Sequence, residues 1–386
     1  MGQYTGDLTT WKSFGDFQNK LNEGRGELPE ATKAKIKSLV SGIEDPQEKI
    51  RKVYTYLQEN TRYVSVQLGI GGWQPFEAKF VDDKGYGDCK ALTNYTKSLL
   101  KEIGIESYYT LVYVGDRVRD ILPDFAASQF NHVILAVPTP QDTIWLECTS
   151  QSQAFDYMSD FTGNREALLV TPEGGKVVQT PSYHENENLL LRKAWIKLDE
   201  EGNASFDVKT CYQALQEGSR DYIVEIASQD QKKWLYKSID LPSFEIDDFS
   251  LVREKESLPK TWESLKLSVR KYASKNGKRI FLPVNPLNKI SPLRSEDNDR
   301  KTPVFIQTGF TDKDSIDFVF PQDFRVEYQP EDIEITSDFG SYKATFSKEE
   351  GQMKYYRYLQ LKHGTYPKEK YPELVKFFKA ISKADK

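Results

Sequence analysis

Apolar residues in the first third of the chain recur at the spacing of a helix. Within residues 46–57 they occupy one helical face: Ile50, Val53, Tyr54 and Leu57. Pro46 suits the first turn of a helix, and Asp45 before it is a suitable N-cap. We therefore predict a helix from Pro46 to about Asn60, within a mostly helical region that spans residues 1–105.

A second helix is predicted to begin at Cys89 and to extend for about 15 residues. Its apolar stripe has the spacing i, i+3, i+7 and i+11: Leu92, Tyr95, Leu99 and Ile103. Gly104 follows the stripe, and glycine is common immediately after a helix. Upstream, the glycines and the proline of residues 68–75 predict a loop. Cys89 is thus expected in the first turn of a helix, directly after Gly87 and Asp88.

Strand patterns replace helical ones after residue 105. Three runs are rich in β-branched and aromatic residues and are bounded by turn formers: 108–114, 131–137 and 143–148. A helix followed by a short antiparallel sheet is typical of the α+β class. We assign residues 1–188 to this first domain.

From about residue 190 the pattern is mostly that of strands. The predicted strands are residues 194–198, 204–208, 265–272, 304–308, 315–320, 342–346 and 353–361. Apolar residues at helical spacing in 368–384 predict a C-terminal helix. The expected second domain, residues 189–386, is an antiparallel β-sandwich with helical insertions near 212–238 and this C-terminal helix.

The composition indicates a folded chain and excludes two classes of protein. Of the 386 residues, 38% are hydrophobic and 13% are aromatic, which is too many for a disordered chain. The formal net charge is −5 without a basic stripe, so nucleic acid is not an expected partner. No apolar run reaches the roughly 20 residues that span a bilayer, so we expect no transmembrane segment. The start lacks the regions of a signal peptide, which predicts either a cytosolic protein or the removal of a targeting segment.

Each of the three cysteines needs its own explanation. An odd, sparse count without a Cys-x-x-Cys pair argues against a disulfide scaffold and a zinc ribbon. Cys148 and Cys211 lie in strand-like runs and are expected to pack as small apolar residues, with a Cys89–Cys148 redox pair as the alternative. Cys89 differs, because a helix N-terminus lowers the pKa of a thiol and presents N–H groups to an oxyanion. Cys89 is therefore either a nucleophile or an inert cysteine at a helix start.

A cysteine nucleophile needs an imidazole base, and the chain has three histidines. His132 lies on a β-branched strand, whereas His184 lies in a polar stretch and is expected to be solvated. His363 lies in the strand-rich half. Glu147 lies on the strand after that of His132, and adjacent antiparallel strands can place the two side chains opposite each other, so that the carboxylate orients the imidazole. Taken singly, His132 is better explained as a satisfied strand histidine, and an ordinary surface carboxylate is the alternative reading of Glu147.

Three short motifs, taken in order, resemble a known family. They are Gly-Asp-Cys-Lys at 87–90, Phe-Asn-His at 130–132 and Trp-Leu-Glu-Cys-Thr at 145–149. They are similar to the transglutaminase-like superfamily, which has a papain-related fold, and in particular to Bacteroidetes-type proteins that place this core between two β-rich domains of unknown function. The resemblance extends to Tyr63, to residues 73–75 and to the C-terminal segments 339–342, 357–358 and 366–372. It implies that the N-terminal β-domain of these relatives is missing here, as in a truncated chain.

The resemblance implies roles for four residues. Cys89 takes the position of the nucleophile and His132 that of the base, while Gln74 matches a glutamine that we interpret as an oxyanion donor. Glu147 stands where relatives usually have aspartate, and Ala91 replaces the aspartate that usually follows Gly-Asp-Cys-Lys. A carboxylate that is one methylene longer can shift the imidazole, and a shift of about 1 Å can cost ~100-fold in rate. Weak or absent activity is therefore an alternative expectation.

The implied function is cysteine-dependent acyl transfer through a thioester, on a peptide or protein substrate. Water as the acceptor gives a peptidase or amidase, which we expect first, and an amine acceptor gives a cross-linking transglutaminase. The alternative class is an inactive module that binds peptide or glycan. A serine or metallohydrolase is not expected, because Gly-x-Ser-x-Gly and His-Glu-x-x-His are absent from the sequence. No cofactor is expected, the resemblance alone implies a periplasmic or cell-envelope location, and the number of subunits is left open.

Overall fold

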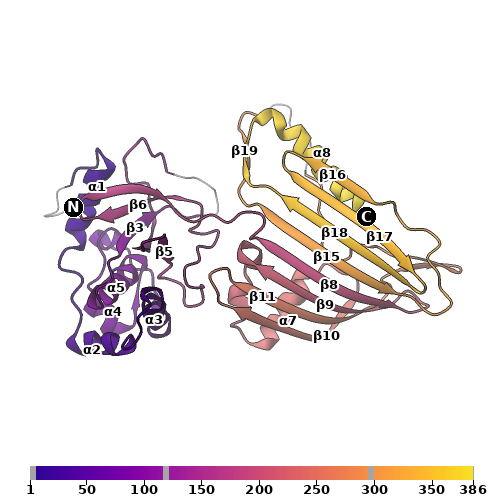
Figure 1. The fold of residues 1–386 in the computed structure, drawn as a ribbon, viewed down its shortest axis with the longest axis horizontal. Coiled ribbons are helices and arrows are strands. Elements are labelled where there is room, and N and C mark those ends of the chain that lie inside the picture. The colour runs from indigo at the N-terminus through magenta and orange to yellow at the C-terminus, as the bar shows by residue number, and fades with distance from the viewer. Residues whose placement is uncertain (1–5, 116–120, 294–299, 386) are drawn as a thin grey trace. The chain divides into compact units, whose positions relative to one another are not determined.

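The computed structural model describes residues 6–115, 121–293 and 300–385 (Figure 1). The described chain forms two compact units, each with its own apolar core. The first unit ends at Ser182 and also includes Lys255–Ser257, and the second contains the remaining described residues. Among the described helices, none has the length and apolar character needed to cross a membrane.

The first unit packs helices against a five-stranded antiparallel sheet (Figure 1). Its helices are α1 (Trp11–Asn22), α2 (Glu30–Leu39), α3 (Pro46–Asn60), α4 (Ala78–Lys84) and α5 (Cys89–Glu102), with one turn of 3-10 helix at Gly69–Gly72. The sheet order is β5-β4-β3-β6-β7, and its strands are β3 (Tyr108–Val112), β4 (His132–Pro138), β5 (Thr143–Leu146), β6 (Glu166–Thr171) and β7 (Gly174–Gln179). A short parallel pair, β1 (Arg62–Tyr63) and β2 (Tyr86–Gly87), precedes α5. The predicted mixture of helices and sheet is confirmed for this unit.

Two helices of the first unit each begin directly after an aspartate that caps them, as predicted for Asp45. Asp45 caps α3, and its Oδ1 accepts a hydrogen bond from Gln47 N at 3.1 Å. Asp88 caps α5, which begins at Cys89, and its Oδ1 accepts from Ala91 N at 3.0 Å. Such caps satisfy N–H groups that the first helical turn leaves unpaired. The cap therefore fixes Cys89 as the first residue of α5.

Helix α1 approaches β7 closely through two glycines. A Cβ on Gly15 would lie 1.9 Å from the backbone nitrogen of Gly175, a distance that no side chain tolerates. A Cβ on Gly175 would in turn lie 2.1 Å from Trp11 O. This close packing places the apolar face of α1 in the same cluster as Cys89: Phe14, Phe17 and Leu21.

The second unit is built on one eight-stranded sheet with the order β10-β11-β9-β8-β15-β18-β17-β16. Its strands are β8 (Leu189–Leu198), β9 (Ala204–Gln213), β10 (Phe244–Glu254), β11 (Lys260–Val269), β15 (Phe310–Val319), β16 (Ile333–Ser337), β17 (Gly340–Glu349) and β18 (Gln352–Leu361). Neighbouring strands are antiparallel except β8 and β15, which are parallel. Two short pairs lie outside this sheet: β12 (Ser274–Asn276) with β13 (Arg279–Phe281), and β14 (Val304–Ile306) with β19 (Gly364–Tyr366).

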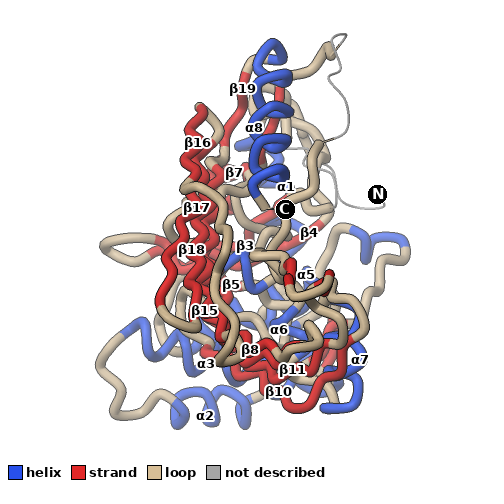
Figure 2. Tube along the Cα trace, turned by 90° about the vertical axis from the view of Figure 1, so that its right-hand side faces the viewer, coloured by secondary structure: helices blue, strands red, loops and turns tan. Residues whose placement is uncertain are grey.

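The prediction of an antiparallel β-sandwich is corrected by this sheet, whose buried face is covered by helices. α7 (Ser228–Ser238) and α8 (Tyr371–Ala384) share one apolar core with the strands, and both lie on the same side of the sheet in Figure 2. A single-turn helix, α6 (Arg220–Ile223), precedes α7. Residues of β8 alternate between exposed and buried. Such alternation predicts a half-buried strand but does not reveal whether a sheet or a helix covers it. The predicted helical insertion and C-terminal helix are confirmed.

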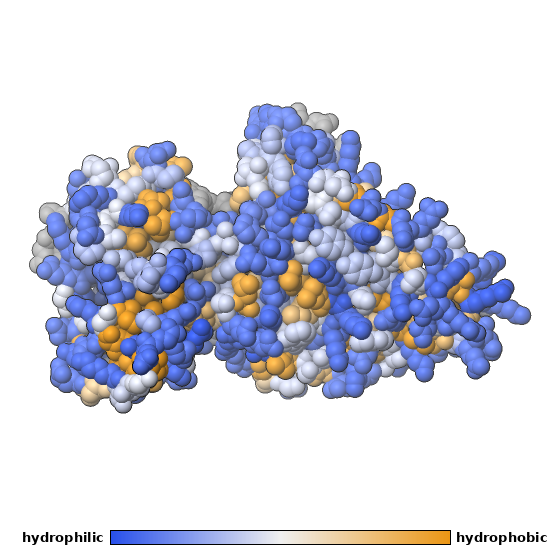
Figure 3. All heavy atoms as spheres, viewed as in Figure 1, coloured by the Kyte–Doolittle hydropathy of each residue, from blue (hydrophilic) through white to orange (hydrophobic). Residues whose placement is uncertain are grey.

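The two edge strands of the eight-stranded sheet are irregular or short. β10 has a bulge between Ile246 and Asp248, and Asp247 and Asp248 are adjacent acidic residues. β16, at the other edge, has five residues. On the face that Figure 3 shows, apolar residues of the second unit are interspersed with hydrophilic ones.

A charged network lies inside the second unit. Arg357 on β18 is fully buried, and its Nε donates to Asp385 Oδ1 at 2.9 Å, while Nη1 donates to Asp314 Oδ2 at 3.2 Å. Asp385, at the end of α8, also accepts from the Tyr342 hydroxyl at 3.0 Å. Arg192 pairs with the other oxygen of Asp314 at 3.1 Å. A carboxylate is unfavourable at a helix C-terminus, so Arg357 accounts for its presence there.

Candidate active site

The Gly-Asp-Cys-Lys motif holds the thiol of Cys89 at the start of α5. One oxygen of Asp88 caps the helix, and the other accepts a hydrogen bond from Lys90 Nζ, with both side chains buried. A Cβ on Gly87 would lie 2.7 Å from the Ala91 Cβ, so glycine allows the chain to pass close to the first turn. The motif therefore places Cys89 where unpaired N–H groups and the helix dipole favour a negative charge.

His132 and Glu147 meet at the ends of β4 and β5. His132 Nε2 lies 2.9 Å from Glu147 Oε2, and Oε1 accepts from Thr149 N at 3.0 Å and from Thr149 Oγ1 at 2.5 Å. The strands pair Leu135 with Leu146. Extending this register places Glu147 diagonal to His132, which corrects the prediction that they lie directly opposite. A glutamate is long enough to span this diagonal, and the imidazole is held from one side as predicted.

The side chains of His132 and Glu147 form a buried ion pair. Burial opposes the charged imidazolium, but the charge of Glu147 and hydrogen bonds to Cys89 and Glu147 outweigh it and raise the pKa of His132 to about 10. Burial also opposes the carboxylate, yet His132 and Thr149 hold the pKa of Glu147 below its usual value. Because Nε2 faces Glu147, Nδ1 is the ring nitrogen left for the hydrogen bond to Cys89. The imidazole of His132 thus lies between the thiol of Cys89 and the carboxylate of Glu147, an arrangement that acyl transfer can use.

A cavity of about 280 Å³ opens beside this group and is lined by Cys89, Lys90 and His132. Aromatic side chains from three separate segments line it as well: Phe14, Trp73 and Phe130. Their rings pack together, with centroids 6.4 Å apart for Phe14 and Trp73 and 5.9 Å apart for Phe14 and Phe130. Cys89 is only 3% exposed, so the thiol faces a small cavity whose lining mixes aromatic and polar side chains.

Gln74, the predicted oxyanion donor, is absent from the described residues that line this cavity. Its Nε2 donates to Leu21 O at 2.9 Å, and its Oε1 accepts from Arg25 Nη2 at 2.9 Å. Gln18 on α1 lines the cavity, and its Nε2 donates to Trp73 O at 3.3 Å. Sequence reasoning missed Gln18 because α1 carries no motif, and only the glycine contact with β7 brings this helix to the site.

Tyr109 on β3 is a second feature that the sequence pattern did not indicate. Its hydroxyl is buried and has no hydrogen-bond partner among the described residues. Burial, followed by the negative charges of Cys89 and Asp88, raises the pKa of Tyr109, so the hydroxyl stays protonated. An O–H group without an acceptor therefore lies in the same cluster as the thiol.

The other two cysteines are packed as predicted. Cys148 and Cys211 are buried and free of disulfide bonds. Burial raises the pKa of Cys148 to about 12 and raises the pKa of Cys211. High pKa values make both thiols poor nucleophiles, which leaves Cys89 as the candidate.

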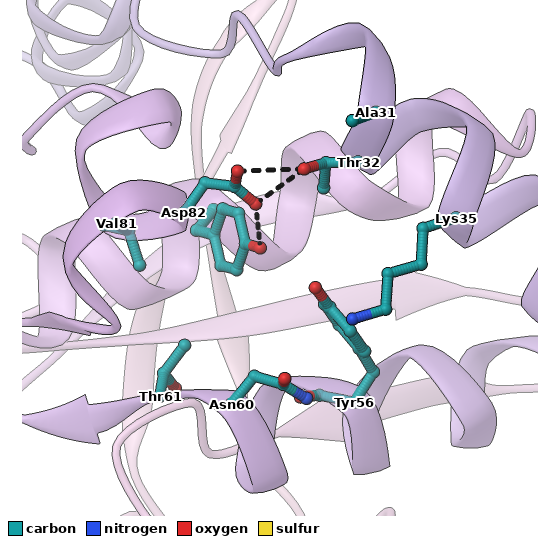
Figure 4. A pocket seen from close by; sticks show the side chains of 9 residues that line it. Ala31, Thr32, Lys35, Tyr56, Asn60, Thr61, Val81 and Asp82 are labelled. Atoms are coloured by element: carbon teal, nitrogen blue, oxygen red, sulfur yellow. Dashed lines mark hydrogen bonds between the residues drawn. The ribbon is translucent and has the colours of Figure 1, made fainter.

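A separate cavity of about 300 Å³ lies among the helices of the first unit (Figure 4). Asp82 accepts hydrogen bonds from Thr32 Oγ1 at 2.8 Å and from the Tyr95 hydroxyl at 2.7 Å. Lys35 Nζ lies 4.6 Å from the centre of the Tyr56 ring. These contacts join α2 to α3, α4 and α5, so the polar groups of this cavity hold helices together.

Comparison with known families identifies the core that holds this site. A model of the transglutaminase-like superfamily matches residues 33–152, which include Cys89, His132 and Glu147. The chain carries a transglutaminase-like core. It is followed by a DUF3858 domain, a domain of unknown function with solved structure, whose model matches residues 278–386. Strands β15 to β18 lie in the DUF3858 match, whereas β8 to β11 lie between the two matched regions.

Two of the solved structures that resemble the chain are described as proteases. One is described as a "putative protease" from Parabacteroides distasonis ATCC 8503, with a TM-score of 0.55 and 10% identity. The match covers 97% of this chain and 57% of the other, so this chain spans a little over half of that protein. The other, a "putative cysteine protease" from Cytophaga hutchinsonii, has a TM-score of 0.25 and 17% identity, over 37% of this chain and 46% of that chain. The similarity to the Parabacteroides distasonis protein shows the fold of both units. No curated protein matched the chain.

In the transglutaminase-like core, we expect Glu147→Gln to lower the pKa of His132, because the amide keeps the length of the side chain and removes its charge. The raised pKa of His132 stabilises the folded wild type. This contribution is complete below the pKa of histidine in the unfolded chain, about 6.5, and it is lost as pH rises through the pKa of His132 in the folded protein. The lowered pKa of Glu147 adds stability that is lost as pH falls through its folded value. The free energy of unfolding of the wild type should exceed that of the variant by about 2 kcal/mol near pH 6, and by less at strongly acidic or strongly basic pH.

Proton NMR of the His132 ring gives its pKa, and urea unfolding across this pH range gives the stability difference. Because the site contains a single histidine, its ring signals are assigned by comparison with a His132→Ala variant. An unchanged His132 pKa in Glu147→Gln would show that the carboxylate does not set the charge of the imidazole.

Proposed function

We propose that the transglutaminase-like core forms a thioester between Cys89 and a carbonyl carbon of a peptide or protein, and releases the acyl group to water as a peptidase or amidase. One observation carries this proposal: Cys89, at the N-terminus of α5, lines one cavity with His132, whose Nε2 lies 2.9 Å from Glu147 Oε2. Such a chain of contacts activates a nucleophile in many unrelated folds. The match to the transglutaminase-like superfamily supports it.

The proposed reaction has two steps. The Cys89 thiolate attacks the carbonyl carbon, the carbon–nitrogen bond breaks, and His132 gives its proton to the departing amine. His132 then accepts a proton from water, whose oxygen attacks the thioester, and the acid leaves as the carbon–sulfur bond breaks. The raised pKa of His132 keeps the imidazolium charged at neutral pH, so that the ring can give its proton to the departing amine.

The carbonyl oxygen carries negative charge during each step and needs hydrogen-bond donors. The Cys89 N–H at the start of α5 is one proposed donor. The resemblance gives Gln74 as the second, but this role requires its amide to leave Leu21 O. Gln18 lines the cavity, unlike Gln74, and is the donor that we favour, although its Nε2 would have to release Asn22 Oδ1 or Trp73 O.

A specific observation favours a second candidate function, a weakly active module that binds peptide. The 3% exposure of Cys89 and the aromatic lining of its cavity suit the retention of an apolar side chain. An amine acceptor in place of water would make the core a cross-linking transglutaminase through the same thioester. The resemblance to exported proteins supports a periplasmic or cell-envelope location as part of this proposal.

The relative rates of alkylation by iodoacetamide test the proposed nucleophile. Cys89 and Cys211 are both 3% exposed, so a difference between their rates reports thiolate content rather than burial. We expect Cys89 to react at least about 10-fold faster at pH 6.5, and His132→Ala to abolish most of this difference. Tryptic peptides analysed by mass spectrometry give both rates from one sample. Equal rates in the wild type would contradict the acyl-transfer mechanism and favour the binding module.

A further inference from the structure

Two of the three histidines of the chain meet beside one carboxylate in the second unit. His184 and Glu185 lie in the segment before β8, and His363 lies in the turn between β18 and β19. One potential ligand atom from each of the three lies within 4.8 Å of the others. His363 Nδ1 is 3.8 Å from Glu185 Oε2, and the centroids of the two imidazole rings are 5.5 Å apart. His184 is exposed, as the sequence predicted.

The sheet explains how residues so distant in the sequence come together. β15 lies between β8 and β18, as Figure 1 shows, and is parallel to the first and antiparallel to the second. Thr311 pairs with Leu189 near the start of β8, and Phe310 pairs with Leu361 at the end of β18. The segment that enters β8 and the turn that leaves β18 therefore meet at one end of the sheet.

The backbone around these three residues is held in place. Thr311 Oγ1 donates to Glu185 O at 2.7 Å, and Asn188 Nδ2 donates to Gly309 O at 2.8 Å. A Cβ on Gly309 would lie 2.8 Å from His363 N and 3.3 Å from Glu185 Cβ. The absence of a side chain at Gly309 thus allows the two ligand-bearing segments to approach each other.

We propose that His184, Glu185 and His363 bind a divalent transition-metal ion, with Zn²⁺ as the best fit. Two imidazoles and one carboxylate are a donor set that suits Zn²⁺ and its neighbours, whereas Ca²⁺ and Mg²⁺ prefer oxygen alone. Ligand atoms of a tetrahedral zinc site lie roughly 3.3 Å apart, from bond lengths near 2.0–2.1 Å. His184 and His363 are exposed and Glu185 is half-buried, so rotation of the two imidazoles can close the remaining gap.

Three protein ligands leave a fourth position for water. The ion would join the segment that enters the second unit to the β18–β19 turn, in addition to the hydrogen bonds through Thr311 and Asn188. The site shares no residue with the Cys89 group, so the proposed metal binding can be tested independently of the proposed function.

Calorimetric titration of Zn²⁺ into the full chain, without a histidine tag, tests the proposal. A Cys89→Ala/His132→Ala background removes the other thiolate and imidazole that could bind the ion. We expect one ion per chain with micromolar or tighter affinity. Co²⁺ bound in place of Zn²⁺ should give visible absorption bands that report the coordination.

Single substitutions in that background assign the ligands. His184→Ala, His363→Ala and Glu185→Gln should each weaken Zn²⁺ binding at least about 10-fold. Glu187→Gln is the matched control, because it removes a neighbouring carboxylate while an oxygen remains to accept the hydrogen bond from His184 N. Circular dichroism confirms that each variant is folded. No measurable binding in the background chain, or binding that survives both histidine substitutions, would overturn the proposal and leave an ordinary pair between His363 and Glu185.

Discussion

A Cys89→Ala variant is expected to lose turnover by at least about 10⁴-fold while remaining folded. Loss of the nucleophile of a catalytic triad costs on the order of 10⁶-fold in kcat in a serine protease, which sets the scale. Alanine removes only the sulfur, and the Asp88 cap on α5 remains. The residue lies in an apolar cluster, so the substitution leaves the packing of α1 against the sheet largely unchanged.

Two assays on the same preparation separate the possible acceptors. Release of peptides from fluorescently labelled casein measures hydrolysis, and incorporation of dansylcadaverine into casein measures transfer to an amine. Cys211→Ala, which removes an equally buried thiol in the second unit, should retain the wild-type rate. Turnover by Cys89→Ala at the wild-type rate would refute the thioester mechanism. Retention of casein without turnover, by wild type and variant alike, would favour the binding module.

The second large effect is expected in the sheet unit, where Asp385→Ala should lower the free energy of unfolding by about 3–5 kcal/mol. Arg357 is fully buried and would lose the carboxylate that pairs with its Nε, keeping only Asp314. The Tyr342 hydroxyl would lose its acceptor as well. Leaving one buried charge without its partner destabilises the folded state by more than the intact ion pair stabilises it.

Urea unfolding monitored by circular dichroism measures this loss. Glu373→Ala is the control on the same helix, because its pair with Lys370 is exposed and such pairs contribute about 0–1 kcal/mol. A combined Arg357→Met/Asp385→Leu variant should recover much of the stability, since it removes both charges together. If Asp385→Ala lowers the free energy of unfolding by less than about 1 kcal/mol, the charged network contributes little to the packing of α8 against the sheet.

Short-range sequence features predicted correctly where α3 and α5 begin. The Asp45 and Asp88 caps are short-range features, and the helices begin after them. The Cys89, His132 and Glu147 side chains were grouped from their order along the chain, and the structure brings them together. The register places Glu147 two residues from the position opposite His132, because the length of the β4–β5 turn does not determine where Glu147 leaves the strand.

Features that depend on contacts between residues far apart in the sequence could not be predicted from the pattern of residues. Helix α1 reaches the site through Gly15, whose partner Gly175 lies far along the chain, so the contribution of Gln18 had no local signal. The strands of the second unit were recognised by alternation, yet their cover was assigned to a sheet instead of α7 and α8. The meeting of His184 with His363 depends on β15 lying between two other strands, which is a property of topology.

The outermost strands of the second unit also have a consequence for how the protein behaves in concentrated solution. A regular outer strand offers unpaired N–H and C=O groups to a neighbouring molecule and promotes aggregation. In β10 the irregularity at Ile246 to Asp248 distorts this row of groups, and the adjacent aspartates repel a second copy. At the opposite side, five residues of β16 offer little length for pairing. The sheet can thus stay open without recruiting further strands from other molecules.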